Sequence, residues 1–575
     1  MALPCSHPQQ VLHDFIGHEL PPNLAPDSQL SFARIRGWLE DCDRNHASCR
    51  AARPTFMPKR VIEISSNTDA DADSDASAAP IRARLVRDEK VAPYIALSYC
   101  WGGDQPAKTT NALLPAYERD IPLHTLPQTI RDALTVTHAI GFRYLWVDAM
   151  AIIQDDGPDK VDQIAQMHNI YRGASLTLAA AAAATSRDGF LRPRTQHRPS
   201  LLAARTDDST FGQVLVAPMP QHALPLPLYT RAWTFQENQL ATRTLAYGPR
   251  EPVFQCLEAA HRDGGHSGVL AQVDAGGTSE RDAAVQLLRH QDPGSRRLGV
   301  DPGAGIKHPR AWGRVVAAYT QRALTVAADK LPAVAAIAEE YARTSPVSDY
   351  LAGLWREELL VQCLWAVALQ PLPGEVVANS NNRGGEAEYR APSWSWAALD
   401  AHVVPSDADS RAVLTAALLH AETTLRRGEV SRFGMVAAGH LRLRCRVARA
   451  VWSNTGLRGG GAGRAVADSP AMWPDSYGLD ERLTFSVDDH GLWPAGEEVA
   501  FWCAEVCSYL DGRKASGEGL LLVEVVGEAR RLALPGGGGA VFRRAGKAYF
   551  RSGYDRPYWF DDEKLGVEWR EVVVV

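Results

Sequence analysis

A tryptophan and a glutamate stand four positions apart in a segment, residues 228–240, whose pattern predicts a helix. Positions four apart lie on one face of a helix, so Trp233 and Glu237 are expected to be neighbours. An indole beside a carboxyl group gives a partly desolvated acid and an aromatic wall on which a base or a pyridine ring can stack. The alternative is a structural carboxylate that pairs with Arg231 or Arg243, or that faces water. On residue types alone, this structural alternative is favoured.

Two further polar positions end predicted buried strands. Asp148 closes the strand at residues 144–147, and ligands of parallel sheets bind beyond the carboxyl ends of strands. Ser98 lies in the strand before Trp101 and Gly102, where a glycine allows close approach of the backbone to a ligand. The alternatives are a helix cap or an ion pair for Asp148, and for the glycine segment a tight turn with a packed indole, which the pattern favours. The predicted site is therefore Glu237 as the catalytic residue, with ligand-binding positions Ser98, Trp101, Gly102, Asp148 and Trp233.

Cysteine and histidine are also grouped near the start of the chain. Cys42, His46 and Cys49 have a spacing typical of metal ligands, but they supply only three ligands, and no CxxC pair supplies the rest. Ordinary buried thiols are the favoured interpretation, and no metal site is predicted.

An alternation of strands and helices positions the candidate residues. Pro127 is expected in the first turn of a helix that Gly141 ends, and Thr230 is expected to cap the helix that carries Glu237. The predicted elements of this part are strands at 94–100, 144–147 and 175–178, with helices at about 127–140 and from about 159. This order predicts a parallel sheet with right-handed crossovers.

The rest of the chain divides by composition. Four parts are predicted: an N-terminal helical and linker region (1–90), an α/β core (91–260), a helical extension ending in a tryptophan-rich packing segment (261–400) and a β-rich unit (401–575). Helices are expected at 31–49, 315–327 and 331–341, strands at 441–447, 499–503 and 520–525, and loops at 67–79 and about 260–310.

Bulk properties exclude several classes of protein. The chain has 575 residues, 45% hydrophobic and 22% charged, which is typical of a globular protein with more than one folding unit. The net charge of −6 is spread along the chain, so the sequence shows no basic cluster typical of nucleic-acid binding. No apolar run is long enough to span a bilayer. The first ten residues lack the apolar region of a secretory signal, and the nine cysteines are mostly isolated, so a cytoplasmic location is expected. There is no P-loop, no G-x-S-x-G and no H-E-x-x-H motif.

Four ordered segments carry a resemblance to a known family. The segments are YIALSYCWG at 94–102, LPQTIRDA at 126–133 leading into YLWVDAMAIIQD at 144–155, RAWTFQE at 231–237 and APSWSW at 391–396. In this order they resemble the signature blocks of fungal heterokaryon incompatibility (HET) domain proteins. The segments WLEDC at 38–42 and DKLP at 329–332 support the resemblance. Two positions depart from the family pattern: Ala151 stands where a cysteine is usual, and Ala232 where many members have glycine.

The resemblance implies a fold and an activity. HET domains are thought to be similar to Toll/interleukin-receptor (TIR) domains, so it implies a TIR-like, flavodoxin-like parallel sheet flanked by helices. Some TIR domains cleave NAD with a glutamate four residues after a tryptophan, a spacing that Trp233 and Glu237 reproduce. The implied function is an intracellular effector in non-self recognition and regulated cell death, with NAD as a substrate and no firmly implied cofactor. The implied partners are an unidentified incompatibility protein or further copies of the chain. The alternative is an assembly module of the same family without enzymatic activity.

Overall fold

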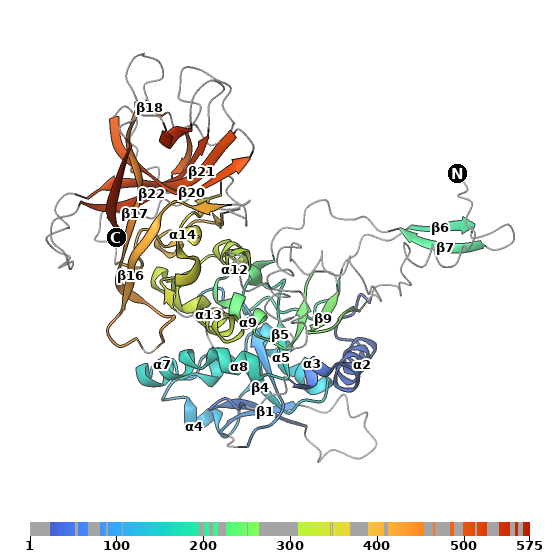
Figure 1. Cartoon of the computed structure of the whole chain (residues 1–575). Helices are drawn as coiled ribbons and strands as arrows, with labels where there is room; N and C mark the ends of the chain where they lie inside the picture. Colours follow the sequence, from blue (N-terminus) through green and yellow to red (C-terminus); the bar gives the residue numbers. More distant parts are fainter. Residues whose placement is uncertain are drawn as a thin grey trace. The chain divides into compact units, whose positions relative to one another are not determined.

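The chain forms two compact units, Met1–Asp282 and Ala283–Val575, in a computed structural model (Figure 1). The structure describes residues 23–51, 56–66, 81–87, 90–105, 107–194, 200–205, 211–216, 226–249, 251–263, 309–345, 347, 349–368, 389–406, 412–429, 431–453, 464–465, 483–487, 498–511, 514–525, 540–551, 558–561 and 567–575. The first ten residues, the polar tract at 67–79 and nearly all of the loop predicted at 260–310 lie outside this part. The four-part division of the chain stays a prediction.

An eight-stranded mixed sheet forms the centre of the first unit. Its strands, in spatial order, are β10 (Ala260–Arg262), β9 (Pro252–Cys256), β8 (Arg243–Tyr247), β5 (Leu176–Ala179), β3 (Tyr94–Ser98), β4 (Tyr144–Trp146), β1 (Val61–Ser66) and β2 (Ile81–Val86). The central strands β4, β3, β5 and β8 are parallel, and an antiparallel pair flanks them on each side.

The order of the parallel strands creates a switch point. Along the chain, β3 is followed by β4 on one side, and the chain then crosses back to place β5 and β8 on the other side. The connections carry α5 (Gln128–Ala139), α6 (Asp148–Ala151), α7 (Gly157–Ala165), α8 (Met167–Gly173) and α9 (Trp233–Gln239). In such sheets ligands bind beyond the carboxyl ends of the two strands at which the direction reverses, which here are β3 and β5.

Alternating side chains of β3 supply both cores of this sheet. Ile95 and Leu97 pack into the cluster that includes α5 residues, whereas Tyr94 and Ala96 pack into the cluster that includes α8 residues. All five residues of β3 are fully buried, as expected for a central parallel strand. Ser98, the last residue of the strand, therefore lies on the α8 side of the sheet.

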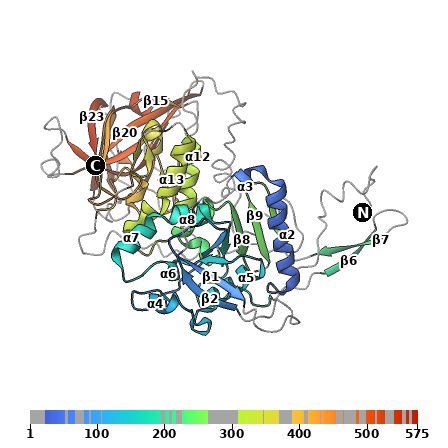
Figure 2. The ribbon, with the colours of Figure 1, turned by 90° about the horizontal axis from the view of Figure 1, so that it is seen from below.

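An N-terminal helix covers the other end of the first cluster. Helix α2 (Gln29–Asn45) starts at the N-cap Ser28, whose Oγ accepts a hydrogen bond from the Ser31 amide. Its buried Phe32, Ile35 and Leu39 belong to the same core as β9, and α2 lies alongside β9 (Figure 2). The short α3 (Ala47–Ala51) follows directly. Further elements of this unit are α4 (Leu114–Tyr117), the 3-10 turns η1 (Leu123–Thr125) and η2 (Pro227–Thr230), and the hairpin of β6 (Ser200–Arg205) and β7 (Phe211–Val216).

The second unit joins a helical segment to a large, mostly antiparallel sheet, in which the pairs β17–β18 and β22–β23 are parallel. Its core gathers aromatic rings around α12 (Pro309–Thr320) and α13 (Pro332–Thr344), and the indole Nε1 groups of Trp312 and Trp396 both donate to the Gly353 carbonyl. Trp394 and Trp396 of the predicted packing segment are fully buried. The nine-stranded sheet contains β15 (Val413–Leu414), β16 (Ala417–Leu425), β17 (Val436–Ser453), β18 (Arg464–Ala465), β19 (Leu483–Val487), β20 (Glu498–Asp511), β21 (Lys514–Glu524), β22 (Val541–Arg551) and β23 (Glu568–Val574). Smaller elements are η3 (Ala327–Lys330), β11 (Tyr350–Leu351), β12 (Leu354–Trp355), η4 (Arg356–Glu358), α14 (Leu359–Gln362), β13 (Ala366–Val367), η6 (Trp396–Ala398), β14 (Val403–Val404) and η9 (Trp559–Asp561).

The predicted fold class is confirmed: a parallel sheet flanked by helices precedes a helical segment and a β-rich region. Four predicted helices were wrong in extent. The helix predicted at 31–49 is interrupted at His46, between α2 and α3, and the helix predicted at 315–327 ends at Thr320. The helix predicted from Asp159 is two helices, because the chain turns at Gln166 between α7 and α8. The helix predicted at 228–240 begins only at Trp233, and Ala232 rather than Thr230 is its N-cap. No helix within the described ranges is long and apolar enough to cross a membrane.

Candidate functional site

The carboxyl group of Glu237 meets the hydroxyl of Ser98 at the end of β3. Ser98 Oγ donates to Glu237 Oε2 over 2.5 Å, and both side chains are buried. The two residues come from segments 139 positions apart in the chain. The hydrogen bond places Glu237 beyond the carboxyl end of β3, one of the two strands at the switch point.

The late start of α9 positions Glu237 and its neighbour Arg231. Arg231 has an extended backbone, with φ −93° and ψ 135°, which ends the 3-10 turn η2 and separates it from α9. Its Nη1 donates to the Tyr99 carbonyl over 2.9 Å. The Thr234 hydroxyl donates to the Leu228 carbonyl and so ties the two turns together. The arginine is thereby held on the same side of the sheet as the glutamate.

Burial sets the protonation of Glu237. The pKa of Glu237 is raised from 4.5 to about 7. Removal of the carboxyl group from water is the largest cause, and the nearby Asp148 acts in the same direction. The hydrogen bond from Ser98, the charge of Arg231 and the nearby Tyr171 hydroxyl lower this pKa but do not offset the effect of burial. At neutral pH, Glu237 is therefore poised between its acid and its carboxylate.

Asp148 lies after the adjacent strand β4. It is not the end of the strand, as predicted, but the first residue of α6, because β4 ends at Trp146. Its Oδ2 accepts a hydrogen bond from Trp101 Nε1 over 2.8 Å, and its Oδ1 accepts one from the Ala149 amide over 2.6 Å. Burial raises the pKa of Asp148, while the Trp101 hydrogen bond opposes the rise.

The turn after β3 requires glycine. Gly102 has φ +70°, and a Cβ built there would lie 2.4 Å from the Thr185 Cβ and 2.7 Å from the Thr185 Cα. The glycine thus permits close packing against the 185 segment, and no ligand is needed to explain it. The indole of Trp101 is held by Asp148, so the turn that contains Trp101 and Gly102 lies beside the Asp148 carboxyl group.

Trp233 occupies the same helix as Glu237, at the start of α9. It is half-buried, and the spacing of four puts its side chain on the Glu237 side of the helix. The structure thus brings Ser98, Asp148 and Glu237 together, with Trp101 bonded to Asp148. It places Gly102 in the adjoining turn and Trp233 on the same short helix.

Tyr171 and Tyr99 of this cluster were not predicted, and Arg231 was named only as a partner of Glu237 in the structural alternative. Tyr171 donates its hydroxyl to the Leu97 carbonyl over 3.1 Å and lies near Glu237. Tyr99 accepts a hydrogen bond from Gln105 over 3.0 Å and lies near Asp148. A hydroxyl at a buried helix position, such as that of Tyr171 in α8, is the signal that would have marked it.

Comparison with known proteins bears on this cluster directly. Residues 94–237 match the family model described as Heterokaryon incompatibility protein (HET). The match supports a heterokaryon incompatibility domain in this part of the chain. It begins at the first residue of β3 and ends at Glu237, so it spans the whole carboxyl-end cluster. No curated protein and no solved structure matches the chain.

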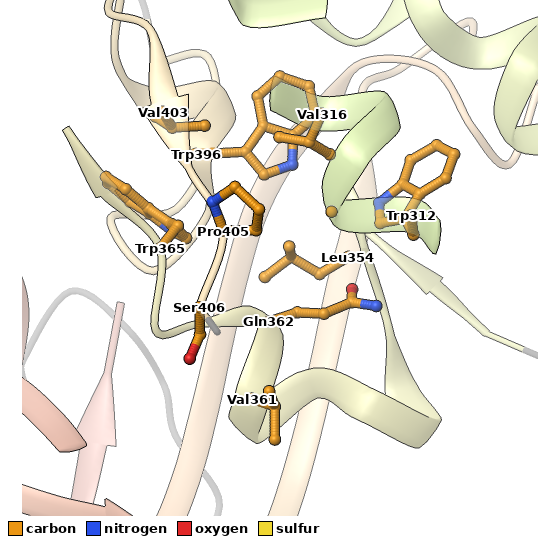
Figure 3. A pocket seen from close by; sticks show the side chains of 11 residues that line it. Trp312, Val316, Leu354, Val361, Gln362, Trp365, Trp396, Val403, Pro405 and Ser406 are labelled. Atoms are coloured by element: carbon orange, nitrogen blue, oxygen red, sulfur yellow. The ribbon is translucent and has the colours of Figure 1, made fainter. Parts of the chain in front are cut away.

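Outside the matched residues 94–237, a pocket in the second unit offers little chemistry. It encloses about 370 Å³ of empty space, part of it open to solvent (Figure 3). None of its lining residues is ionisable at neutral pH, and Trp312, Trp365 and Trp396 contribute much of the wall. The pocket has the character of a gap in an aromatic core.

Two groups of metal-ligating side chains occur among the residues that the structure describes. One is His420, Glu422 and His440 on β16 and β17, in which His420 and Glu422 are exposed. The other lies in the first unit and adds Cys256 to the predicted trio Cys42, His46 and Cys49. The sequence missed this fourth member because Cys256 is 210 positions from His46 and has no cysteine near it.

Proposed function

We propose that the HET domain belongs to an intracellular effector of fungal non-self recognition and regulated cell death, and that it acts by cleaving NAD at Glu237. The observation that carries this proposal is the buried Ser98–Glu237 pair beyond the carboxyl end of β3. The family match supports the incompatibility role, and the TIR-like order of strands and the Trp233–Glu237 spacing support the reaction.

Cleavage of the nicotinamide–ribose bond depends mainly on a negative charge near the ribose. It needs little help from an acid. The bond breaks with its electron pair going to the pyridinium, which leaves as neutral nicotinamide. The ribose develops oxocarbenium character, and a water molecule then adds to it with release of a proton. A carboxylate beside the developing cation lowers the barrier, so one carboxylate suffices.

Within this scheme, each residue of the cluster has a role. Glu237 supplies the negative charge, and the Ser98 hydroxyl fixes its orientation through the 2.5 Å hydrogen bond. Trp233 offers an aromatic surface for the nicotinamide or adenine ring. Asp148 and Trp101 hold the adjacent rim of the site. Because the pKa of Glu237 is about 7, activity is expected to rise as the pH rises through 7 and the carboxylate forms.

The test is release of nicotinamide by the purified full chain incubated with NAD, measured by chromatography over a range of protein concentrations. The wild type is expected to release nicotinamide and Glu237→Ala to lose this activity. Glu118→Gln, which alters an exposed glutamate in the same domain, serves as the matched control and is expected to retain it. Equal absence of nicotinamide from wild type and Glu237→Ala at all concentrations contradicts the enzymatic proposal.

A second candidate is a non-catalytic assembly module. The observation in its favour is that the Glu237 carboxyl group already has internal partners in Ser98, Tyr171 and Arg231, as a structural carboxylate does. In this case Glu237→Ala that still folds retains its toxicity when overexpressed. Surface substitutions that block self-association abolish the toxicity instead.

A further inference from the structure

Three cysteines and one histidine of the first unit converge on one point. The ligand atoms of Cys42, His46, Cys49 and Cys256 all lie within 4.8 Å of one another, and Cys256 Sγ is 3.3 Å from His46 Nδ1. A tetrahedral Zn²⁺ with bonds of about 2.3 Å to sulfur and about 2.0 Å to nitrogen has ligand atoms separated by about 3.5–3.8 Å. The four atoms are therefore close enough together for one zinc ion to bind all of them with small adjustments of the side chains. We infer that this cluster is a structural zinc site.

The first three ligands come from the end of α2 and from the short α3 that follows it. Cys42 is in the last turn of α2, and His46 ends the helix with an extended backbone, φ −96° and ψ 107°. The chain then starts α3, which carries Cys49. Cys42 and His46 are four residues apart, so they lie on one face of the helix. The break at His46 then turns the chain so that Cys49 of α3 lies on the same side as Cys42.

The fourth ligand comes from the hairpin of β9 and β10. Cys256 is the last residue of β9, and its amide bonds the Ala259 carbonyl over 2.8 Å to form the turn. In the register of the sheet, Cys256 pairs with Arg243, the first residue of β8. This places the cluster at the amino ends of the parallel strands, the edge opposite to Ser98 and Glu237.

The turn presents a backbone N–H group to a sulfur atom. The Ala259 amide donates to Cys256 Sγ over 3.2 Å. Such donors stabilise the negative charge that thiolates carry when they bind zinc. The Glu258 carboxylate also accepts the Ser48 amide over 2.7 Å, so the turn and α3 are joined beside the site.

The surroundings fit a zinc ion bound by three thiolates and an imidazole. That group carries one net negative charge, and the guanidinium of Arg243 lies beside Cys42 and pairs with Asp43. All three cysteines are buried, whereas His46 is partly exposed and leaves a route for the ion. Four protein ligands complete the tetrahedral coordination of zinc and leave no position open for a substrate or water. The site is therefore structural, and it holds α2 and α3 against the β9–β10 hairpin. All four lie outside the matched residues 94–237.

The test uses the untagged full chain produced in zinc-supplemented medium, with its zinc measured by inductively coupled plasma mass spectrometry. About one zinc ion per chain is expected for the wild type, and loss of the zinc for Cys256→Ala and Cys42→Ala. Cys503→Ala removes a buried cysteine of the second unit and is expected to keep the ion. A folded wild type without zinc, or an unchanged zinc content in Cys256→Ala, overturns the proposal.

Two further measurements keep the test decisive if the alanine variants do not fold. Cys256→His retains four ligands, so it is expected to bind metal, and cobalt in place of zinc is expected to show tetrahedral visible bands with weaker sulfur charge transfer than in the wild type. Mass spectrometry of protein purified without oxidant is expected to find free thiols that zinc protects from alkylation. A disulfide between Cys49 and Cys256 in that protein overturns the proposal.

Discussion

The two edges of the first unit's sheet hold polar clusters of opposite character. At the carboxyl edge, Ser98, Asp148 and Glu237 bring oxygen atoms and buried carboxyl groups together. At the amino edge, the side chains of Cys42, His46, Cys49 and Cys256 lie together. These are soft ligands, which neither take up nor release protons while a metal is bound. The two clusters lie at opposite edges of one sheet. Glu237 at the carboxyl edge can therefore gain or lose its proton, while the proposed zinc site at the amino edge holds α2 and α3 in place. This difference predicts that the two clusters respond independently to substitution, to chelators and to pH.

The largest effect is expected from metal removal at the amino edge. By mass action, zinc at about 1,000 times its dissociation constant stabilises the folded unit by about 4 kcal/mol. Chelation is expected to lower the thermal midpoint and to increase hydrogen exchange in α2 and β9. Readdition of zinc is expected to restore both. If the Cys256→Ala variant shows the same midpoint shift with chelator as the wild type, the effect does not come from this site.

The second effect is the replacement of Gly102 at the carboxyl edge. Gly102→Ala combines φ +70° with a Cβ 2.4 Å from the Thr185 Cβ, and it is expected to destabilise the unit by about 3 kcal/mol. Gly141→Ala is the matched control, because φ there is +87° and a Cβ meets nothing within 4 Å. Chemical denaturation of both variants measures the difference, and zinc content is expected to remain the same in both. Equal losses of stability would show that the close packing at Thr185 is not what requires glycine.

The carboxyl edge was the more predictable of the two clusters. Parallel strands end at one edge, so Ser98 and Asp148 could be placed together from the strand pattern alone. The pattern did not reveal Tyr171, because a hydroxyl at a buried helix position leaves no periodic signal. Arg231 could be named only as one of two arginines near Glu237 in the sequence, because an extended residue between two turns leaves no periodic signal either.

The amino edge shows why sequence spacing is insufficient. Cys42, His46 and Cys49 were recognised as an incomplete metal pattern, and the fourth ligand depends on the register of β8 with β9. That register is set by packing and hydrogen bonding between strands that are distant from α2 in the sequence, so the local spacing of residues does not contain it. For the same reason the β-rich region was predictable as strands, but its pairing order was not.

The third effect is a pH dependence confined to the carboxyl edge. The pKa of Glu237 is raised from 4.5 to about 7, so ionisation costs free energy in the folded state only. The stability associated with the neutral acid is complete below 4.5 and is lost as the pH rises through about 7. Glu237→Gln removes this loss, and its advantage over the wild type is expected to grow by about 3 kcal/mol across that window. Denaturation at several pH values measures it, and a difference that does not change with pH would contradict a buried, titrating Glu237.

The smallest effect tests the hydrogen bond that joins β3 to α9. Ser98→Ala removes the 2.5 Å bond that holds the pKa of Glu237 down, so that pKa is expected to rise and the pH at which stability is lost to rise with it. The hydroxyl is buried and its partner remains, so a stability loss of about 1–2 kcal/mol at neutral pH is expected. Under the enzymatic proposal, the pH at which NAD cleavage begins is expected to rise as well. A non-catalytic assembly module would lose stability but would show no NAD cleavage at any pH. A double-mutant cycle completes the test: the single variant Glu237→Gln and the double variant Ser98→Ala/Glu237→Gln are also denatured over the same pH range. The effect of Ser98→Ala on the pH dependence of stability must vanish in the double variant, because position 237 no longer titrates.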